Sequence, residues 1–387
     1  MKITAYAKYG CKIFGRYKLM CAIIIIQLTA VLCALNIAIG NYNSRNMLYM
    51  PFEDILSKDG LFMFYDDIRL DENGNELSEP VSGNDIFYEM FGKLKGDVGY
   101  TEIYQYFSNE PYSVLALPDD IYNALSMPLS KGSYAGAVAT ENSNIAAGDT
   151  VNVGNTKIKI SGVLTENTYI PSLGKCSLEM KVSDLYEEYN SDSDRQPVVI
   201  AAYSTVKDEA LAPNTMKFLY YNSPPTDEER AYNDEIIQSG DGMFVPLSEI
   251  NERSKTYVND NLKKIFPVAV CVGIIAMLGT VCCVSIVTVL CLKTHAVMYL
   301  CGASLKDCIA VNTATIAIID IVSAALLLIA MKIIDLSSQA EKLAAVILQN
   351  NVLFSVLMYA FMILISVIMI IAIFSHRKPK QLLMEEK

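Results

Sequence analysis

The run "LMCAIIIIQLTAVLCALNIAI", residues 19–39, decides the fold class because it has no charged side chain over a length that can cross a bilayer. About 20 helical residues span a hydrocarbon core of ~30 Å. Three later runs share this apolar character: residues 265–292, 308–334 and 352–374. An ordinary soluble domain rarely needs four such runs in its core, so the sequence predicts four membrane helices. A cleaved signal peptide is the alternative for the first run, but its apolar part is too long.

Charge is distributed very unevenly along the chain. Residues 41–264 hold 36 acidic and 18 basic side chains, whereas basic residues dominate in 1–18 and directly after 374. By the positive-inside rule, both termini are predicted to be cytoplasmic in a multi-pass protein of the cell membrane. The predicted parts are a cytoplasmic amphipathic helix (1–18), a first span (19–39), an extracytoplasmic domain (40–264), a second span (265–292), a cytoplasmic coupling loop (293–307), a third span (308–334), an outer loop (335–351), a fourth span (352–374) and a cytoplasmic tail (375–387).

The segment before the first span has the pattern of an amphipathic helix. Apolar residues recur at three- and four-residue steps, and Lys8, Lys12 and Arg16 recur every four residues. Such a basic amphipathic helix is expected to lie in the inner membrane interface. Anchoring alone explains the pattern, and contact with a partner is a less favoured addition.

The extracytoplasmic segment mixes strand and helix signals, which predicts an α+β domain. Its clearest element is "TVNVGNTKIKI", residues 150–160, where apolar residues alternate on both sides of Gly154-Asn155, as in a β-hairpin. Further strands are predicted at 61–65, 198–203 and 217–221, and short helices at 119–125 and 183–189.

A helical stalk is predicted to join this domain to the second span. Apolar residues between 246 and 265 follow a mostly helical spacing, and no helix breaker occurs before Pro267 inside the span. The proline is expected to kink the helix at most.

Several kinds of chemistry are disfavoured by the sequence. The chain has no GxxxxGK[ST] loop, and its two histidines, His295 and His376, are both predicted to be cytoplasmic. Only Cys176 lies in the extracytoplasmic domain, so an intrachain disulfide is not expected there, and we see no metal site. The many carboxylates allow an acid and base pair in principle, but a solvated acidic surface is the favoured interpretation. We therefore expect no catalytic residue, no cofactor bound by this chain and no nucleic-acid partner.

The cytoplasmic loop contains a pattern of its own, "VMYLCGASLKDC" at residues 297–308. Gly302 permits a turn after a short helix predicted at 293–301, and the small Ala303 and Ser304 permit close approach of another protein. Met298, Tyr299 and Leu300 are expected to supply an apolar contact surface. A plain connector between two spans is the alternative, but a connector needs neither the helix nor the apolar cluster.

Two short segments together resemble the MacB/FtsX-type permeases of ABC transporters. The loop segment matches at Leu300, Gly302, Ala303, Ser304 and Lys306, while Leu305 replaces a basic residue that the family carries. The segment "AAGDTVNVGNTKIKISGVL", residues 146–164, looks like a segment of the family's outer domain and matches at Gly148, Asp149, Val151, Gly162 and Val163. The arrangement of one span, a large outer domain and three more spans is also that of the family.

This resemblance implies a permease subunit that works by mechanotransmission. A separate cytoplasmic ATPase would bind ATP and Mg²⁺ and dock at the coupling loop, and the permease would form a homodimer or a heterodimer with a second permease. The motion would reach the extracytoplasmic domain and drive export or extraction of a peptide, a lipoprotein or an amphipathic drug. The alternative is an FtsX-like membrane regulator or scaffold that activates cell-wall hydrolases. A membrane-bound enzyme ranks third.

An acidic residue within the third span departs from the family pattern. The family often carries a glutamate near the position of Thr315, whereas this chain has Asp320. An acid at mid-span costs about 2.5–3.5 kcal/mol on insertion scales. Asp320 is expected to hydrogen-bond a polar residue on a neighbouring helix, for example Asn36 or Gln27, or to be protonated; a contact in a dimer interface is the sharper but less favoured alternative.

Overall fold

The computed structural model describes residues 3–64, 87–88, 91–92, 97–106, 111–165, 168–172, 177, 179–189, 196–209, 211–239, 243–337 and 344–375. The chain forms two compact units. The helical unit comprises Met1–Asn43 and Asn261–Lys387, and the sheet unit comprises Ser44–Asp260. In sequence, the sheets therefore lie between the first and second long helices.

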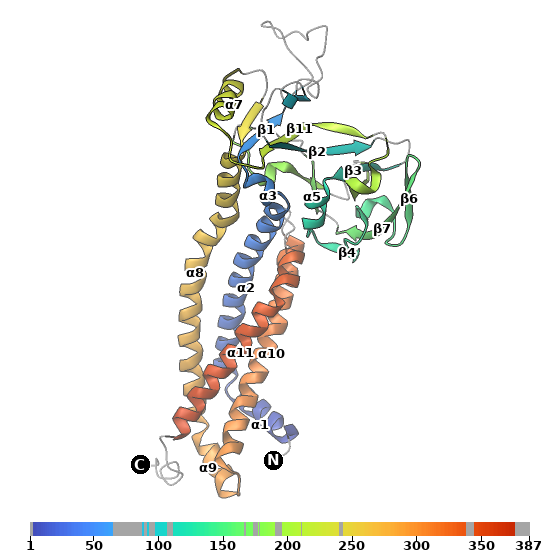
Figure 1. The fold of residues 1–387 in the computed structure, drawn as a ribbon. Coiled ribbons are helices and arrows are strands. Elements are labelled where there is room, and N and C mark those ends of the chain that lie inside the picture. The colour runs from blue at the N-terminus through green and yellow to red at the C-terminus, as the bar shows by residue number, and fades with distance from the viewer. Residues whose placement is uncertain are drawn as a thin grey trace. The chain divides into compact units, whose positions relative to one another are not determined.

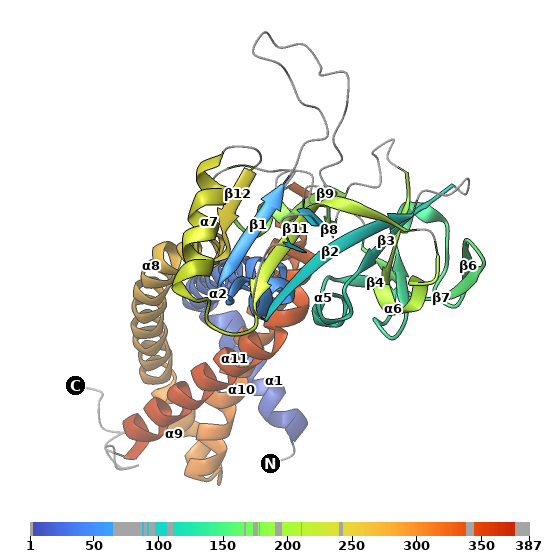
Figure 2. The ribbon, with the colours of Figure 1, turned by 45° about the horizontal axis from the view of Figure 1, so that its top comes forward.

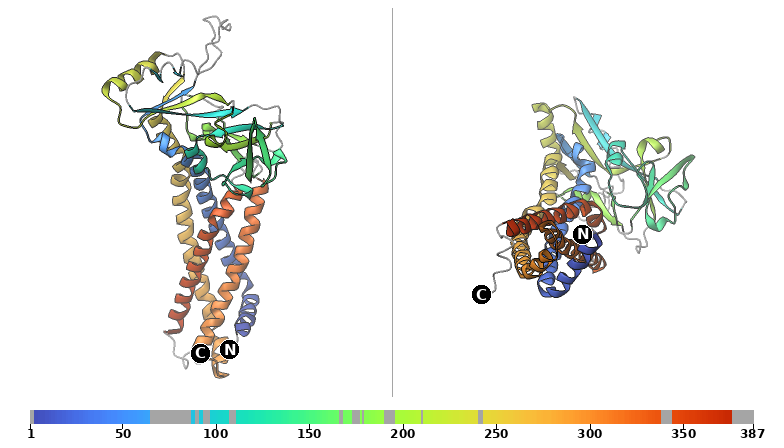
Figure 3. Two further views of the ribbon diagram at one scale, coloured as in Figure 1. Left: turned by 45° about the vertical axis from the view of Figure 1, so that its right-hand side comes forward. Right: turned by 90° about the horizontal axis from the view of Figure 1, so that it is seen from below.

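The helical unit is built from four long helices, which lie side by side in Figures 1 and 3. They are α2 (Lys18–Tyr49), α8 (Leu247–Leu290), α10 (Leu305–Ser337) and α11 (Ala344–Ser375). Among the described residues, four segments are long and apolar enough to cross a membrane: Lys18–Leu56, Phe266–Leu290, Leu305–Ile333 and Ser355–Phe374. The four apolar runs of the sequence thus form helices, although α2 continues well beyond Ile39, where the first span was predicted to end.

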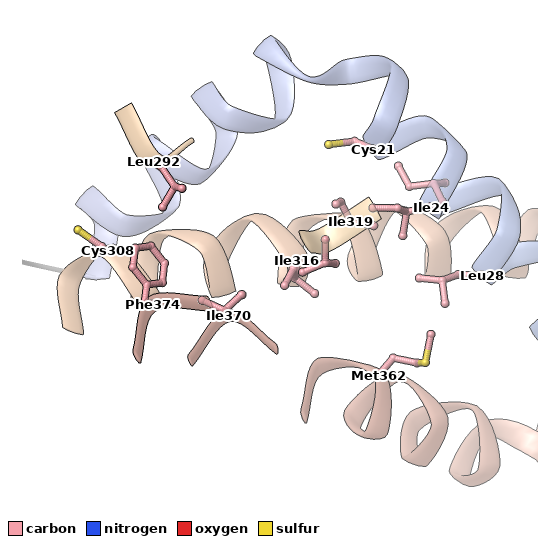
Figure 4. Close-up of a cluster of buried hydrophobic side chains, with 12 residues drawn as sticks. Cys21, Ile24, Leu28, Leu292, Cys308, Ile316, Ile319, Met362, Ile370 and Phe374 are labelled. Atoms are coloured by element: carbon pink, nitrogen blue, oxygen red, sulfur yellow. The ribbon is translucent and has the colours of Figure 1, made fainter. Parts of the chain in front are cut away.

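The core of the helical unit is a cluster of buried apolar side chains from several helices (Figure 4). Members include Leu28 of α2, Ile319 of α10 and Phe374 of α11. On the outer faces of the same helices, apolar side chains remain exposed, among them Ile275 at 66% and Leu353 at 71%. Exposed apolar surface of this extent is unusual for a protein in water and is what a lipid-facing bundle presents.

The N-terminal segment forms the predicted helix, α1 (Ile3–Arg16). Its lysines, Lys8 and Lys12, are exposed, while Ile13 is buried against Val311 of α10. A Cβ atom on Gly10 would lie 3.1 Å from the Thr315 backbone nitrogen, so the two helices touch at this glycine. Membrane anchoring alone is therefore an incomplete account of the apolar face, because much of it packs on the chain's own α10.

The sheet unit is organised around one large mixed sheet, part of whose strand order can be followed in Figure 2. The order of hydrogen-bonded neighbours is β12-β1-β11-β2-β3-β10-β5-β7-β4, with β6 paired to β7. The pairs β3·β10 and β5·β7 are parallel, and β8 and β9 form a separate two-stranded sheet. The strands are β1 (Gly60–Phe64), β2 (Val98–Tyr106), β3 (Ser113–Leu117), β4 (Leu129–Gly132), β5 (Ala137–Ala139), β6 (Thr150–Val153), β7 (Thr156–Leu164), β8 (Thr168–Pro171), β9 (Tyr186–Tyr189), β10 (Val198–Ala202), β11 (Ala212–Tyr221) and β12 (Met243–Pro246).

Short helices connect these strands. The α-helices are α3 (Glu53–Leu56), α5 (Asp119–Ala124), α6 (Tyr203–Val206) and α7 (Asp227–Ser239), and the 3₁₀ helices are η1 (Met50–Phe52), η2 (Glu141–Ser143) and η3 (Val182–Leu185). The α+β character predicted for this part of the chain is confirmed.

The predicted hairpin is present as β6 and β7, with Val151 opposite Ile158. Its alternating residues Val151, Val153, Ile158 and Ile160 are all buried, because period-two spacing places them on one face. The strands predicted at 61–65, 198–203 and 217–221 are present as β1, β10 and β11, except that Tyr203 begins α6 and Tyr65 lies outside the described residues. Cys176 also lies outside them.

One predicted helix is wrong. Residues 183–189 were expected to form a helix, but only the first part is helical, in η3, and Tyr186–Tyr189 form β9. Strand β9 pairs with β8, which places Tyr186 opposite Pro171. A distant strand therefore decides the conformation, and local helix signals could not reveal it.

Residues 247–265, where the sequence has a mostly helical spacing, form the first part of a long helix. Helix α8 runs without interruption through Pro267. Its first residues belong to the sheet unit, where Ser254 is buried and its hydroxyl accepts a hydrogen bond from the Val182 amide at 2.8 Å. The rest of α8 belongs to the helical unit, where Val284 joins the core.

Candidate functional site

The loop between α8 and α10 contains a short helix, α9 (Leu292–Leu300), that ends in a Schellman motif. The Ala303 amide donates to the Met298 carbonyl at 3.0 Å, and the Gly302 amide donates to the Tyr299 carbonyl at 3.0 Å. Gly302 has φ +91°, a left-handed conformation that a side chain would strain, although no atom lies within 4 Å of a Cβ placed there. The predicted turning role of this glycine is therefore a matter of backbone conformation.

Helix α10 begins directly afterwards with a capping box. The Ser304 amide donates to Asp307 Oδ2 at 2.8 Å, and the Asp307 amide donates to Ser304 Oγ at 3.3 Å. This reciprocal pair satisfies two amide groups at the helix start. Asp307 also accepts a 2.5 Å hydrogen bond from the Tyr6 hydroxyl of α1, and this bond raises the pKa of Tyr6. The loop is thus tied to the N-terminal helix.

A buried histidine of α9 contacts α10 and α11. Our reasoning from the sequence did not predict this packing role. His295 is 1% exposed, and its Nε2 lies 3.2 Å from Asn312 Oδ1 on α10. Its ring also meets the Phe374 ring edge-on, with centroids 5.5 Å apart. Burial lowers the pKa of His295, so the ring is neutral near pH 7. The signal available in the sequence was a histidine and an asparagine within otherwise apolar helices.

The opposite side of the loop is exposed. We call this patch the coupling surface and define it as the apolar residues Val297, Tyr299, Leu300 and Leu305 together with Lys306. Leu300 is 66% exposed and Val297 is 59% exposed, and Lys306 lies exposed beside Leu305. These apolar side chains contribute nothing to the caps that shape the loop. The capping bonds explain the glycine and the serine of the motif, but they leave the apolar side chains unexplained.

Two of the residues predicted for this surface are placed differently. Met298 is half-buried and packs against two core clusters, one with Ile316 and the other with Val311 of α10, so its side chain points into the helical unit. Ala303 is half-buried and takes part in the helix cap through its amide. Val297, which the sequence analysis did not select, takes the place of Met298 on the exposed side.

The outer-domain motif residues all belong to the β6–β7 region and its approach. Asp149 Oδ2 accepts a hydrogen bond from the Ala146 amide at 2.8 Å, and the Gly148 amide donates to the Ile160 carbonyl at 2.7 Å. Val151 and Val163 are buried. A Cβ on Gly162 would lie 2.9 Å from the Ser133 carbonyl oxygen, so only glycine fits beside this backbone. The motif residues are therefore explained by structure: Gly148 and Asp149 form a turn before β6, and Val151 and Val163 are part of the buried core of the sheet unit.

Asp320 is buried in the helical unit, with 6% of its surface exposed. Its Oδ2 atom has no hydrogen-bond partner among the described residues. The buried Oε1 atom of Gln27 likewise has no hydrogen-bond partner among them. Asn36 instead donates to the Leu32 carbonyl at 2.7 Å and to Ser355 Oγ at 3.0 Å. The predicted hydrogen bond to Asn36 or Gln27 is therefore not formed, and the burial disfavours a contact with a second copy; protonation stays a prediction.

The sheet unit contains a buried ion pair at the centre of its large sheet. Lys217 of β11 and Glu102 of β2 are register partners, form a salt bridge and are 0% and 3% exposed. Tyr104 and Tyr88 donate hydroxyl hydrogen bonds to the same carboxylate, and the Phe87 ring lies 5.3 Å from the Lys217 ammonium. Burial lowers the pKa of Lys217. Because the Glu102 carboxylate is bonded to Lys217, Tyr104 and Tyr88, we assign the ion pair a role in stability and not in catalysis.

Among the described residues, no group of three or more His, Cys, Asp or Glu side chains could hold a metal ion. No protein-family model matches the sequence, and no curated protein matches it.

Proposed function

We propose that this chain is the permease subunit of an ABC transporter of the MacB/FtsX type, working by mechanotransmission. In this proposal a separate cytoplasmic ATPase binds at the coupling surface, and its ATP-driven closure moves α8. The observation that supports the proposal is the coupling surface: an exposed apolar patch on a firmly capped loop, placed between two helices that could cross a membrane. Patches of this kind mark sites of protein contact.

The rigidity of the loop supports the same proposal. Force applied to Leu300 can reach the long helices only if α9 does not unwind or swing away. The Schellman motif closes one end of α9, and His295 fixes its underside to α10. Coupling between sites requires an element that both sites can bias, and α9 joined to α8 is our candidate.

The proposed output is motion of the sheet unit, because α8 continues from the helical unit into the sheet unit as one helix. Peptides, lipoproteins and amphipathic drugs are the proposed substrates. We place the sheet unit on the extracytoplasmic side, both termini in the cytoplasm, and two permeases in the working assembly.

The test is co-purification of the full chain from native membranes, followed by mass spectrometry and ATPase assay. We expect a P-loop ATPase to accompany the wild-type chain and to be lost from Leu300→Asp. Thr4→Asp, at an exposed position of α1 outside the coupling surface, is the matched control and should retain it. Equal recovery of the ATPase with both variants would argue against docking at this loop.

A further inference from the structure

A groove lies between α1 and the first turns of α10, two helices that also run beside each other in Figures 1 and 3. It is open on one side and has a volume of about 430 Å³. Its walls come from Tyr6 and Ala7 of α1 and from Lys306, Ile309, Ala310, Thr313, Ala314 and Ala317 of α10. The close contact of Gly10 with Ala314 and Thr315 holds the two walls together.

The wall on α10 changes in polarity along its length. Lys306 stands exposed at the first turn, and small or apolar side chains follow as far as Ala317. From Lys306 to Ala317 the helix rises by about 16 Å. On α1, Lys8 and Lys12 are exposed in the turns next to Ala7. The order is cationic and then apolar, which is the order that a phospholipid presents to a membrane protein.

Asp307 follows Lys306 in the chain but does not line the groove. Asp307 accepts hydrogen bonds from Tyr6, from the Ser304 amide and from the Ser304 hydroxyl. These hydrogen bonds hold the carboxylate at the start of α10 and keep the pKa of Asp307 well below its usual range, so it stays negatively charged. Lys306 lines the groove as an exposed cation, and Lys8 and Lys12 are exposed on α1 outside the groove lining.

We propose that this groove binds one anionic phospholipid of the cytoplasmic leaflet, with an acyl chain along the alanines of α10 and the phosphate beside Lys306. The inference rests on the proposed membrane placement of the helical unit, but it needs no ATPase. Basic residues at the cytoplasmic ends of membrane helices are a recurrent feature of anionic-lipid sites.

The charge pattern distinguishes this occupant from the other two candidates. A second copy of the chain seated by the same surface would bring its own Lys306 and Lys8 against these lysines, and like charges oppose such pairing. A water-soluble partner would have to follow the apolar wall about 16 Å into a span. A lipid meets both the cation and the apolar wall.

The experiment is native mass spectrometry of the full chain, purified without an ATPase and exchanged into a neutral detergent. Phosphatidylglycerol is added as the probe and phosphatidylcholine as the comparison. We expect a one-lipid adduct with phosphatidylglycerol that falls to the phosphatidylcholine level in Lys306→Gln, which removes the cation, and in Ala7→Leu, which fills the groove. Lys18→Gln and Gly15→Leu, at exposed positions that do not line the groove, are the matched controls and should keep the adduct.

Each other result would overturn the proposal. Equal adducts with the two lipids, or adducts unchanged in both groove variants, would exclude this site for an anionic lipid. Displacement by the same concentration of glycerophosphoglycerol, which has no acyl chain, would assign the groove to a free anion. A dimer peak that disappears in Ala7→Leu would assign it to a second copy. Failure of ATPase co-purification leaves all of these results unaffected, so the two proposals fail separately.

Discussion

Replacing Glu102 by alanine is predicted to destabilise the sheet unit strongly. The change leaves the Lys217 ammonium buried, 0% exposed, without its carboxylate. Removing one partner of a buried ion pair costs about 3–5 kcal/mol. Domains are stable by about 5–15 kcal/mol in total, so this loss is a large fraction of the free energy of unfolding.

The measurement is pulse proteolysis of the full chain in detergent over a series of urea concentrations, following cleavage within Ser44–Asp260. With a denaturant dependence of about 2–3 kcal/mol per molar urea, the midpoint should fall by about 1–2.5 M. The double variant Lys217→Met/Glu102→Gln keeps an acceptor for Tyr88 and Tyr104 and removes the charge. Its midpoint should lie within about 0.5 M of wild type, because replacing both partners of a buried pair is often neutral. An unchanged midpoint for Glu102→Ala, or a double variant as unstable as the single one, would refute the assignment.

Three further predictions concern the loop between α8 and α10 and the proposed topology. Gly302→Ala forces an alanine to φ +91° and should destabilise the loop by about 1–2 kcal/mol, seen as faster hydrogen exchange of the amides at 302 and 303; exchange identical to wild type would remove the conformational argument. Lowering the pH below about 6.5, the ordinary pKa of histidine, should speed hydrogen exchange of the α9 amides, because the unfolded loop binds a proton that buried His295 does not. His295→Gln should abolish this pH dependence, and its persistence in that variant would contradict the packing role of His295. Cys301 is exposed, and in a variant whose other cysteines are replaced by serine it should react with a membrane-impermeant maleimide only in permeabilised cells. A cysteine introduced at Glu141 in a chain without other cysteines should react in intact cells, and the reverse pattern would invert the proposed topology.

The elements that the sequence predicted well are those whose signal is local and repeated. An apolar run of about twenty residues is long enough for a membrane helix and longer than a typical strand. All four runs form long helices. The β6–β7 hairpin was equally accessible, because period-two alternation and Gly154-Asn155 specify strands and turn together. The turn at Gly302 was predicted from local sequence in the same way, whereas the capping box of Ser304 and Asp307 was not predicted although its residues lie close together in the chain.

The features that sequence reasoning missed depend on residues far apart in the chain. Strand β9 forms because β8 lies beside it, and His295 is buried because Asn312 and Phe374 come from two other helices. The inward position of Met298 follows from the rotation of α9 against its neighbours, which a nine-residue helix does not reveal by periodicity. Asp320 was assigned neighbours by chemical plausibility, and the packing of α2 gave Asn36 other partners.

The most direct test of the central claim is the affinity between the purified chain and the ATPase proposed as its partner, compared for the wild type and Leu300→Asp. About two-thirds of Leu300 remains exposed, and full burial of a leucine contributes about 1.5–3 kcal/mol, so docking should gain about 1–2 kcal/mol from it. The account predicts that Leu300→Asp weakens binding at least about 5- to 30-fold, while Thr4→Asp binds as the wild type does. Equal dissociation constants for the wild type and Leu300→Asp would contradict it.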